Sequence, residues 1–310
     1  MMKKVRHFKT LLDINKNEFL SIIERAVELK KLQTNNEYPD TLRKKIMAMI
    51  FKKNSTRTRI SLESSMSKLG GHAIYLSSDS SQLSRGESLA DTAKVLSGMV
   101  DIIAIRTHSH EEVLELSANS TVPVINALTT KFHPCQLLAD MQTLYEEKGQ
   151  ISDKKVAWVG DGCNMCNSYI NASKILGFHL NIATPHGFEP DEETLKNASD
   201  TAELCDLPGK AVEGCDLVTT DVWSSMGDEH DHDKRKVLFK GYQINQNLMD
   251  KANESAIFLH CLPAHRGEEV AAEVIDGASS RVWQQAHNRL YSSQALIEFL
   301  LNNQIMQSNY

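Results

Sequence analysis

The sequence predicts an α/β protein made of two doubly wound parallel-sheet domains joined by helices. Short runs of β-branched and apolar residues alternate with helical patterns along the whole chain, which is typical of parallel sheets covered by helices. The alternation restarts after a polar segment at 145–155, and 310 residues are enough for two domains. We expect a first domain at 1–149 and a second at 150–289, with a C-terminal helix at about 290–310 that packs back on the first.

The composition excludes several classes of protein. A formal charge of −6 at pH 7 argues against a general nucleic-acid-binding protein and against a binder of acidic membranes. No apolar run approaches the roughly 20 residues that span a bilayer, and the segment 1–7 lacks the apolar core of a signal peptide. The six cysteines are therefore expected to be free thiols. We expect a cytoplasmic protein with no nucleic-acid or membrane partner.

The first half contains four candidate strands, at 45–51, 73–77, 101–106 and 122–127. A helix is expected to begin after Asn15, a plausible N-cap with Glu18 three residues on, and another covers about 89–98. Each strand ends in polar residues. Because ligands bind outside the carboxyl ends of parallel strands, we expect the polar segments that follow them to share one binding edge.

The segment 52–59, Lys-Lys-Asn-Ser-Thr-Arg-Thr-Arg, lies between the first strand and a helical pattern of Leu62, Met66 and Leu69. Its hydroxyls and guanidiniums are therefore expected at a helix N-terminus, where free N–H groups and the helix dipole favour an anion. Arginine adds a planar fork that fits phosphate oxygens. An ordinary helix cap with solvated arginines is the alternative interpretation of the same residues.

A second polar segment, Phe132-His133-Pro134-Cys135-Gln136, precedes another helical pattern. Pro134 suits the first turn of a helix, where a missing N–H is tolerated. His133 and Gln136 are expected to face the same edge as the segment 52–59. A capping or packing role for His133 is the alternative.

The second half has strand candidates at 155–159, 180–184, 217–220 and 256–260. The first runs into Gly160-Asp-Gly162, but the third glycine of a dinucleotide-binding fingerprint is replaced by Met165. An acidic residue is also missing about 20 residues later. These differences argue against a nicotinamide-dependent oxidoreductase. Cys163 and Cys166 form one C-x-x-C pair, which is a weak signal for redox chemistry and is incomplete as a zinc site.

Two further segments follow strands of the second half. Asp221-Val-Trp-Ser-Ser-Met-Gly227 leads into an acidic loop, 228–236, whose His230 and His232 are interpreted as solvated; we expect no metal. The last strand leads into His260-Cys-Leu-Pro263, whose backbone carbonyls are expected to accept hydrogen bonds from a substrate N–H.

Four motifs together resemble those of the ornithine carbamoyltransferases: Ser55-Thr-Arg-Thr-Arg59, His133-Pro-Cys-Gln136, Asp221-x-Trp-x-Ser-Met-Gly227 and His260-Cys-Leu-Pro263. The resemblance covers essentially the whole chain. The first two motifs are similar to those of the wider carbamoyltransferase superfamily, which includes aspartate carbamoyltransferase, and the last two resemble the ornithine enzymes. The resemblance implies a carbamoyl-phosphate domain, an ornithine domain, and a homotrimer or a multiple of trimers.

The activity that the resemblance implies is transfer of the carbamoyl group of carbamoyl phosphate to the δ-amine of L-ornithine, without a cofactor. The products are L-citrulline and phosphate, in arginine metabolism. A transferase acting on another amine, such as N-acetylornithine or putrescine, is one alternative. A non-catalytic, phosphate-ligand-binding regulatory homologue is the other. The direction of the reaction in the cell, the size of the assembly and the group that accepts the amine proton stay open.

The resemblance also implies residue roles. The residues expected to act in catalysis are Arg57, Arg106, His133, Asp221 and Cys261. Those expected to bind carbamoyl phosphate are Ser55, Thr56, Arg57, Thr58, Gln82, Arg106, His133, Gln136, Cys261, Leu262 and Arg289, with Gln82 reaching the site of a neighbouring subunit. Those expected to bind ornithine are Asn164, Asp221, Ser225 and Met226.

Overall fold

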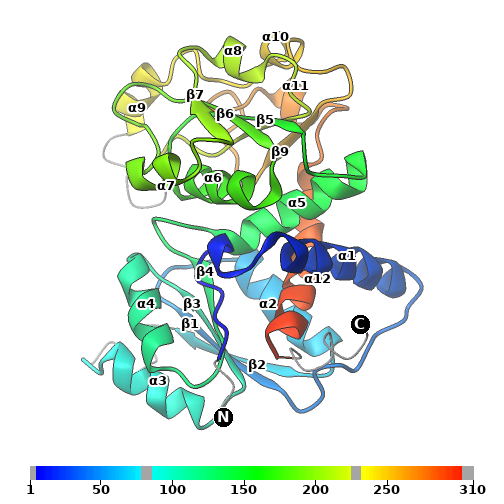
Figure 1. The fold of residues 1–310 in the computed structure, drawn as a ribbon, viewed down its shortest axis with the longest axis vertical. Helices are drawn as coiled ribbons and strands as arrows, with labels where there is room; N and C mark the ends of the chain where they lie inside the picture. Colours follow the sequence, from blue (N-terminus) through cyan, green and yellow to red (C-terminus); the bar gives the residue numbers. More distant parts are fainter. Residues whose placement is uncertain (1–4, 78–85, 225–231, 302–310) are drawn as a thin grey trace. The chain divides into compact units, whose positions relative to one another are not determined.

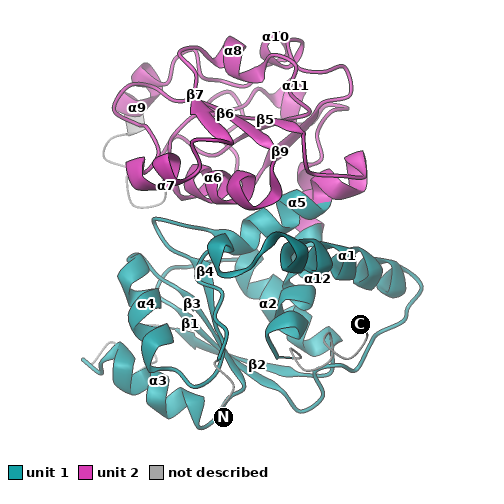
Figure 2. Cartoon of the chain, viewed as in Figure 1, with its two compact units in different colours: residues 1–142, 288–310 teal, residues 143–287 magenta. Residues whose placement is uncertain are grey.

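The computed structural model describes residues 5–77, 86–224 and 232–301, and the chain forms two compact units (Figures 1 and 2). Unit 1 contains 1–142 and 288–310, and unit 2 contains 143–287. The sequence placed the division after residue 149, whereas it falls between Gln142 and Thr143, inside a continuous helix. The polar segment that we took as the boundary is the end of that helix and the turn after it.

Unit 1 is built on a sheet of four parallel strands in the order β2-β1-β3-β4, which confirms the predicted fold class for this half. The strands are β1 (Ile46–Phe51), β2 (His72–Ser77), β3 (Ile102–Arg106) and β4 (Val124–Leu128). The helical elements that lie wholly or partly in unit 1 are η1 (Leu11–Asp13), α1 (Lys16–Thr34), α2 (Arg57–Lys68), α3 (Leu89–Ser97), α4 (His110–Asn119), α5 (Pro134–Lys148) and α12 (Val282–Leu301).

Unit 2 is built on a sheet of five parallel strands in the order β7-β6-β5-β8-β9. The strands are β5 (Lys155–Val159), β6 (His179–Ala183), β7 (Ala202–Leu204), β8 (Leu217–Thr220) and β9 (Ile257–His260). Its own helices are α6 (Asn164–Leu176), α7 (Glu192–Asn197), α8 (Pro208–Val212), α9 (His232–Leu238), α10 (Gln246–Met249) and α11 (Ala272–Ile275). The short edge strand β7 was not predicted from the sequence.

Local sequence sets the ends of the longer helices. Asn15 and Glu18 form a reciprocal capping box that begins α1, as predicted. Farther along α1, Arg25 donates to both carboxylate oxygens of Glu298, at 2.7 and 3.1 Å, and so ties α1 to α12 within unit 1. None of the helices in the described parts of the chain is long and apolar enough to cross a membrane.

Both sheets owe their stability to apolar side chains packed against helices. In unit 1, Ile50, Ile103 and Ile105 of the sheet pack with residues of α3 and α4. In unit 2, Val159, Val218 and Phe258 belong to a cluster that also contains residues of α8, α10 and α11. Burial of this apolar surface fixes the strands, and their carboxyl ends become a rigid edge on which polar side chains can be held.

The turn between β5 and α6 depends on glycine. A Cβ atom on Gly162 would lie 2.3 Å from the Pro190 nitrogen, 2.4 Å from the Glu189 carbonyl carbon and 2.6 Å from the Phe188 oxygen. The Gly162 N–H also donates to that oxygen at 2.8 Å. These are backbone atoms, so the contact cannot be relieved by rotating a side chain. The close approach therefore sets the position of the turn that leads to Asn164.

We predict that Gly162→Ala lowers the free energy of unfolding of unit 2 by about 1–3 kcal/mol, the usual effect of overpacking. Gly209→Ala is a matched control, because its added Cβ would meet only the flexible end of Lys251. Thermal unfolding of both variants, followed by circular dichroism, measures the difference. Equal melting temperatures for the two variants would contradict the proposed role of the close approach.

Candidate active site

In unit 1, the carboxyl ends of β1 and β3 bring two polar segments together. Phe51 and Arg106 are opposite each other at the ends of these strands, and the Lys52 N–H donates to the Arg106 carbonyl at 2.9 Å. The chain after β1 then turns into α2, which begins at Arg57. The predicted anion-binding segment and Arg106 therefore lie at the same edge of the sheet, as expected for a parallel sheet.

The first turn of α2 is capped by Ser55. Its hydroxyl accepts a hydrogen bond from the Thr58 N–H at 3.3 Å, while the side chain of Thr56 makes no capping hydrogen bond. The alternative interpretation, a helix start with solvated arginines, describes Arg59: it is exposed, pairs with Glu63 on the same helix and lies over the Tyr75 ring. Arg57 is different, because its charge acts on the buried His133.

Arg289 of α12 connects the helix starts of α2 and α5. Its Nη2 donates to Thr58 Oγ1 at 2.9 Å, and its Nη1 donates to Gln136 Oε1. Gln136 Nε2 donates in turn to Asp140 Oδ1 at 2.8 Å. Arg289, Thr58 and Gln136 are all at most 3% exposed. The network fixes the orientation of the Gln136 amide and keeps a second hydrogen on its nitrogen for another acceptor.

His133 is buried in unit 1, where the positive charges of three arginines act on it. It is 5% exposed, and burial lowers its pKa well below 6.5. The positive charges of Arg289, Arg106 and Arg57 lower this pKa further, in that order of effect. His133 is therefore neutral at physiological pH and can donate a single hydrogen bond without carrying charge. The capping or packing alternative does not account for three cations around a neutral imidazole.

In unit 2, Asp221 follows β8 and Cys261 follows β9, and these strands are neighbours in the sheet. The Cys261 thiol donates to Asp221 Oδ1 at 3.1 Å, and the Val222 N–H donates to the same oxygen at 2.8 Å. The Cys163 thiol approaches the other carboxylate oxygen at 3.9 Å. Asn164 comes next in the chain and begins α6. Asp221, Cys261 and the start of α6 therefore share one edge of this sheet.

The pKa of Asp221 is raised above 3.8, chiefly because its carboxyl group is buried. His260, the Cys261 thiol and the Val222 N–H oppose the shift, and the negative charge of Glu269 adds to it. A raised pKa makes the carboxylate a stronger base than an exposed aspartate. The group can therefore attract a cationic amine and also compete for its proton.

Sequence analysis missed the pair that holds the Cys261 backbone. His260 Nδ1 accepts a hydrogen bond from the Leu262 N–H at 2.9 Å, so the ring proton is on Nε2, 3.2 Å from Glu269 Oε1. The His265 N–H donates to the same oxygen at 2.6 Å, and both His260 and Glu269 are fully buried. Leu262 has a positive φ of 60°. His260 belongs to the motif His260-Cys-Leu-Pro263, so the sequence could have indicated a role for it. Glu269 lies outside all four motifs, and nothing in the sequence indicated its role.

The C-x-x-C pair does not have the properties of a redox pair. Cys163 and Cys166 are free thiols, and burial raises the pKa of each well above 9.0. A reactive pair needs at least one thiol with a lowered pKa. The structure therefore favours two protonated thiols that flank Asn164.

Two groups of residues in the described ranges have metal-ligand types within reach of one another: Asp221-His260-Cys261 and His265-Glu268-Glu269. Both ring nitrogens of His260 already have hydrogen-bond partners, and Lys236 pairs with Glu268 at 2.8 Å. These donor atoms are used in protein contacts, so neither group fits a preformed metal site.

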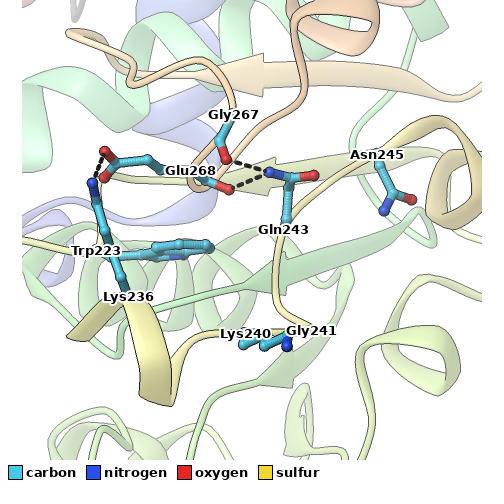
Figure 3. A pocket seen from close by; sticks show the side chains of 8 residues that line it. All are labelled: Trp223, Lys236, Lys240, Gly241, Gln243, Asn245, Gly267 and Glu268. Carbon is cyan, nitrogen blue, oxygen red and sulfur yellow. Dashed lines mark hydrogen bonds and ion pairs between the residues drawn. The ribbon is translucent and has the colours of Figure 1, made fainter. Parts of the chain in front are cut away.

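Three of the predicted ligand-binding residues, Gln82, Ser225 and Met226, lie outside the described residues, as do residues 228–231 of the acidic loop. Beside Trp223 is a surface cavity of about 400 Å³. Figure 3 shows the residues that line it: Trp223, Lys236, Lys240, Gly241, Gln243, Asn245, Gly267 and Glu268. Gln243 Nε2 donates to the carbonyls of Gly267 and Glu268, both at 2.8 Å. The cavity contains none of the predicted ligand-binding residues.

The sequence matches two family models that together cover almost the entire chain. Residues 6–146 match the carbamoyl-P binding domain of aspartate/ornithine carbamoyltransferase, and residues 152–300 match the Asp/Orn binding domain of the same family. These ranges correspond to the two halves of the chain that carry the two sheets.

Individual relatives agree with the family models. The chain is 52% identical over 297 residues to an ornithine carbamoyltransferase of Hydrogenovibrio crunogenus, covering 96% of this chain and 98% of the relative. It is 49% identical over 296 residues to an anabolic ornithine carbamoyltransferase of Pseudomonas savastanoi, covering 96% and 97%. The crystal structure of an ornithine carbamoyltransferase from Burkholderia thailandensis superposes with a TM-score of 0.90 at 44% identity, covering 97% of this chain and 100% of that one. With both models matched and these relatives covered over nearly their full length, the chain belongs to the aspartate/ornithine carbamoyltransferase family.

Proposed function

We propose that the protein is an ornithine carbamoyltransferase, which transfers the carbamoyl group of carbamoyl phosphate to the δ-amine of L-ornithine and releases L-citrulline and phosphate. The observation that supports this most directly is the neutral, buried His133 surrounded by the charges of three arginines. A doubly charged acyl phosphate needs this combination: strong cations for the phosphate and a donor for the carbonyl oxygen.

On the carbamoyl-phosphate side, Ser55, Thr56, Arg57 and Thr58 would hold phosphate and carbonyl oxygens at the α2 N-terminus, with Arg289 beside them. Arg106 and His133 would donate to the carbonyl oxygen as negative charge develops on it. Such donors stabilise a transition state most when they are already oriented and shielded from water. Both side chains are buried, which supports this role.

Recognition of the carbamoyl amide would come from acceptors. Gln136 is held with its oxygen toward Arg289 and its nitrogen toward Asp140, so its remaining lone pair and hydrogen have defined directions. The backbone carbonyls of Cys261 and Leu262 would accept from the carbamoyl NH₂. The His260–Glu269 pair supports this assignment, since it fixes the Leu262 N–H and therefore the local backbone.

On the ornithine side, Asn164 and Asp221, with Ser225 and Met226, would bind the amino acid, and Asp221 and Cys261 would lie next to the δ-nitrogen. The amine has a pKa near that of lysine, about 10.4, so it must lose a proton before it attacks. Its lone pair then attacks the carbonyl carbon, and the bond from that carbon to the phosphate oxygen breaks with its electron pair. The attacking nitrogen loses its second proton in the same reaction, and the departing phosphate takes up a proton to leave as hydrogen phosphate. The raised pKa of Asp221 supports a part for this carboxylate in handling the proton.

The cellular setting belongs to the same proposal. We expect a cytoplasmic homotrimer or a multiple of trimers, with no cofactor, acting in arginine biosynthesis. The support is the resemblance in four motifs together with the anabolic enzyme among the relatives.

The first experiment offers carbamoyl phosphate with L-ornithine, N-acetylornithine, L-aspartate and putrescine in parallel, in the presence of a chelator, and measures the ureido product. Product from ornithine alone is expected. Preference for another amine would retain the assignment of unit 1 and remove that of Asp221 and its loop. No product with any amine would favour a regulatory homologue.

Arg57→Ala is expected to lower turnover by at least about 100-fold, the scale seen when an oxyanion donor is lost. Arg59→Ala is the matched control: it removes the same group from the same helix, but Arg59 is exposed and pairs with Glu63. Steady-state kinetics on both variants, with circular dichroism to check the fold, makes the comparison. Near-normal turnover in Arg57→Ala would remove the phosphate-site assignment.

Asp221→Asn is expected to lower turnover about 100-fold or more, because a positioned proton-accepting group is lost. The variant should nevertheless melt at or above the wild-type temperature at pH 7. The reason is that the folded-state pKa of Asp221 is raised, so ionising the buried carboxyl destabilises the wild-type fold at pH values above that pKa.

This destabilisation disappears as the carboxyl group becomes protonated in both states. The difference in melting temperature between Asp221→Asn and wild type should therefore shrink as the pH is lowered toward the ordinary aspartate value of about 3.9. Melting curves at a series of pH values test the sign. A difference that grows on acidification would show that the carboxylate is stabilised by its surroundings.

A further inference from the structure

Arg235, on α9, joins the two segments of unit 2 that carry the proposed ornithine-binding residues. Its Nη1 donates to Asp161 Oδ2 at 2.8 Å and to the Trp223 carbonyl at 2.6 Å. The side chains of Arg235 and Asp161 are only 19% and 15% exposed. A single guanidinium nitrogen therefore connects the turn after β5 to the segment after β8.

Both ends of this connection are themselves fixed. The Asp161 carbonyl accepts a hydrogen bond from Trp158 Nε1 at 2.9 Å, which anchors the turn to the buried strand β5. The indole of Trp223 stacks on Phe239, with ring centroids 5.6 Å apart and an interplanar angle of 29°. The connection is thus made between two anchored points.

Aromatic rings also hold the side chain of Arg235 in place. Its guanidinium lies over the Phe188 ring, 4.9 Å from the centroid, and Phe188 packs edge-to-face on Phe239 at 4.9 Å. Arg235, Phe188, Phe239 and Trp223 therefore form a closed chain of contacts. A planar guanidinium suits this place, since it can stack on a ring and donate in its own plane at the same time.

The positions of the two joined segments matter for the substrate. Asp161 lies three residues before Asn164, and its charge acts on Cys163 and Cys166 at the start of α6. Trp223 lies two residues after Asp221. The separation between Asn164 and Asp221 is therefore set in part by the length of the Asp161–Arg235–Trp223 connection.

We propose that Arg235 is a positioning residue for the amine acceptor: by joining Asp161 to the Trp223 carbonyl, it sets the spacing of Asn164 and Asp221 and so the affinity for ornithine. This inference rests on the proposed function. Arg235 acts through the segments that it joins. Its loss changes the acceptor affinity and leaves the carbamoyl-phosphate affinity in place.

The test compares Arg235→Ala and Arg235→Lys with Lys240→Ala as the control. Lys240 is exposed, follows the same helix and lines the cavity in Figure 3, so its removal takes away a positive charge and leaves the hydrogen bonds of Arg235 to Asp161 and Trp223 in place. Two readouts are used: KM for each substrate, and the calorimetric Kd of 2-aminopentanoate with carbamoyl phosphate present. That amino acid has both α-groups of ornithine and no δ-amine, so it binds without reacting.

Arg235→Ala should raise KM for ornithine and the Kd of 2-aminopentanoate at least about tenfold, given how strongly misplacement affects binding geometry. KM for carbamoyl phosphate should stay within about twofold, as for independent sites. Arg235→Lys should fall between Ala and wild type, because it restores the charge without the stacking plane. Lys240→Ala should match wild type.

Unchanged ornithine affinity in a folded Arg235→Ala variant, or equal losses for both substrates, would overturn the proposal. If the alanine variant does not fold, Arg235→Lys decides by the same two comparisons. Failure of the proposed function has a different signature: the wild-type protein then makes no citrulline. If the wild type prefers another amine, KM for that amine replaces KM for ornithine in the comparison.

Discussion

The burial of positive charge at one edge of the unit 1 sheet is the constraint on which the proposed chemistry depends. A guanidinium taken out of water must recover its hydrogen bonds within the protein. Arg289 does so with the oxygens of Thr58 and Gln136, which are neutral acceptors. Burial lowers the pKa of His133 most, and the positive charges around it lower this pKa further, so the imidazole stays unprotonated.

Unit 2 has the opposite polarity at the corresponding edge of its own sheet. Its central ionisable group is the carboxyl of Asp221, which accepts hydrogen bonds from the Cys261 thiol and the Val222 N–H and has the Cys163 thiol 3.9 Å from its other oxygen. A carboxylate held by neutral donors keeps its attraction for a cation. Each half of the chain therefore places ionisable groups at the carboxyl ends of its strands: arginines in unit 1, for the proposed phosphate, and a carboxyl group in unit 2, for the proposed amine.

Much of this arrangement could be predicted from the sequence, because it follows from strand ends and helix starts. The strands β5 and β8 were predicted at their observed limits, and α5 begins at Pro134 as its missing N–H led us to expect. The start of α12 at Val282 was not foreseen, since polar residues such as Gln285 and Asn288 obscure its apolar pattern. The edge strand β7 has only three residues and too little pattern to detect.

The residues that hold the site in place were harder to find. Glu269 and Arg235 belong to none of the quoted motifs, and their contacts join positions 9 and 74 residues apart in the chain. A single sequence does not show which distant pairs meet in space. Asp140 is an exception in principle, because it lies four residues after Gln136 on the same helix, where such pairs commonly interact.

The burial of the cysteine thiols affects how readily the protein is oxidised. Burial raises the pKa of Cys135 and of Cys215 to about 12, and it also raises the pKa of Cys163, Cys166 and Cys205. Oxidants and alkylating reagents attack the thiolate form, which is scarce at neutral pH when the pKa is so high. The two thiols beside the proposed acceptor site, Cys163 and Cys166, are therefore protonated and slow to react. Exposure to peroxide should leave all five thiols intact far longer than exposed cysteines with an ordinary pKa.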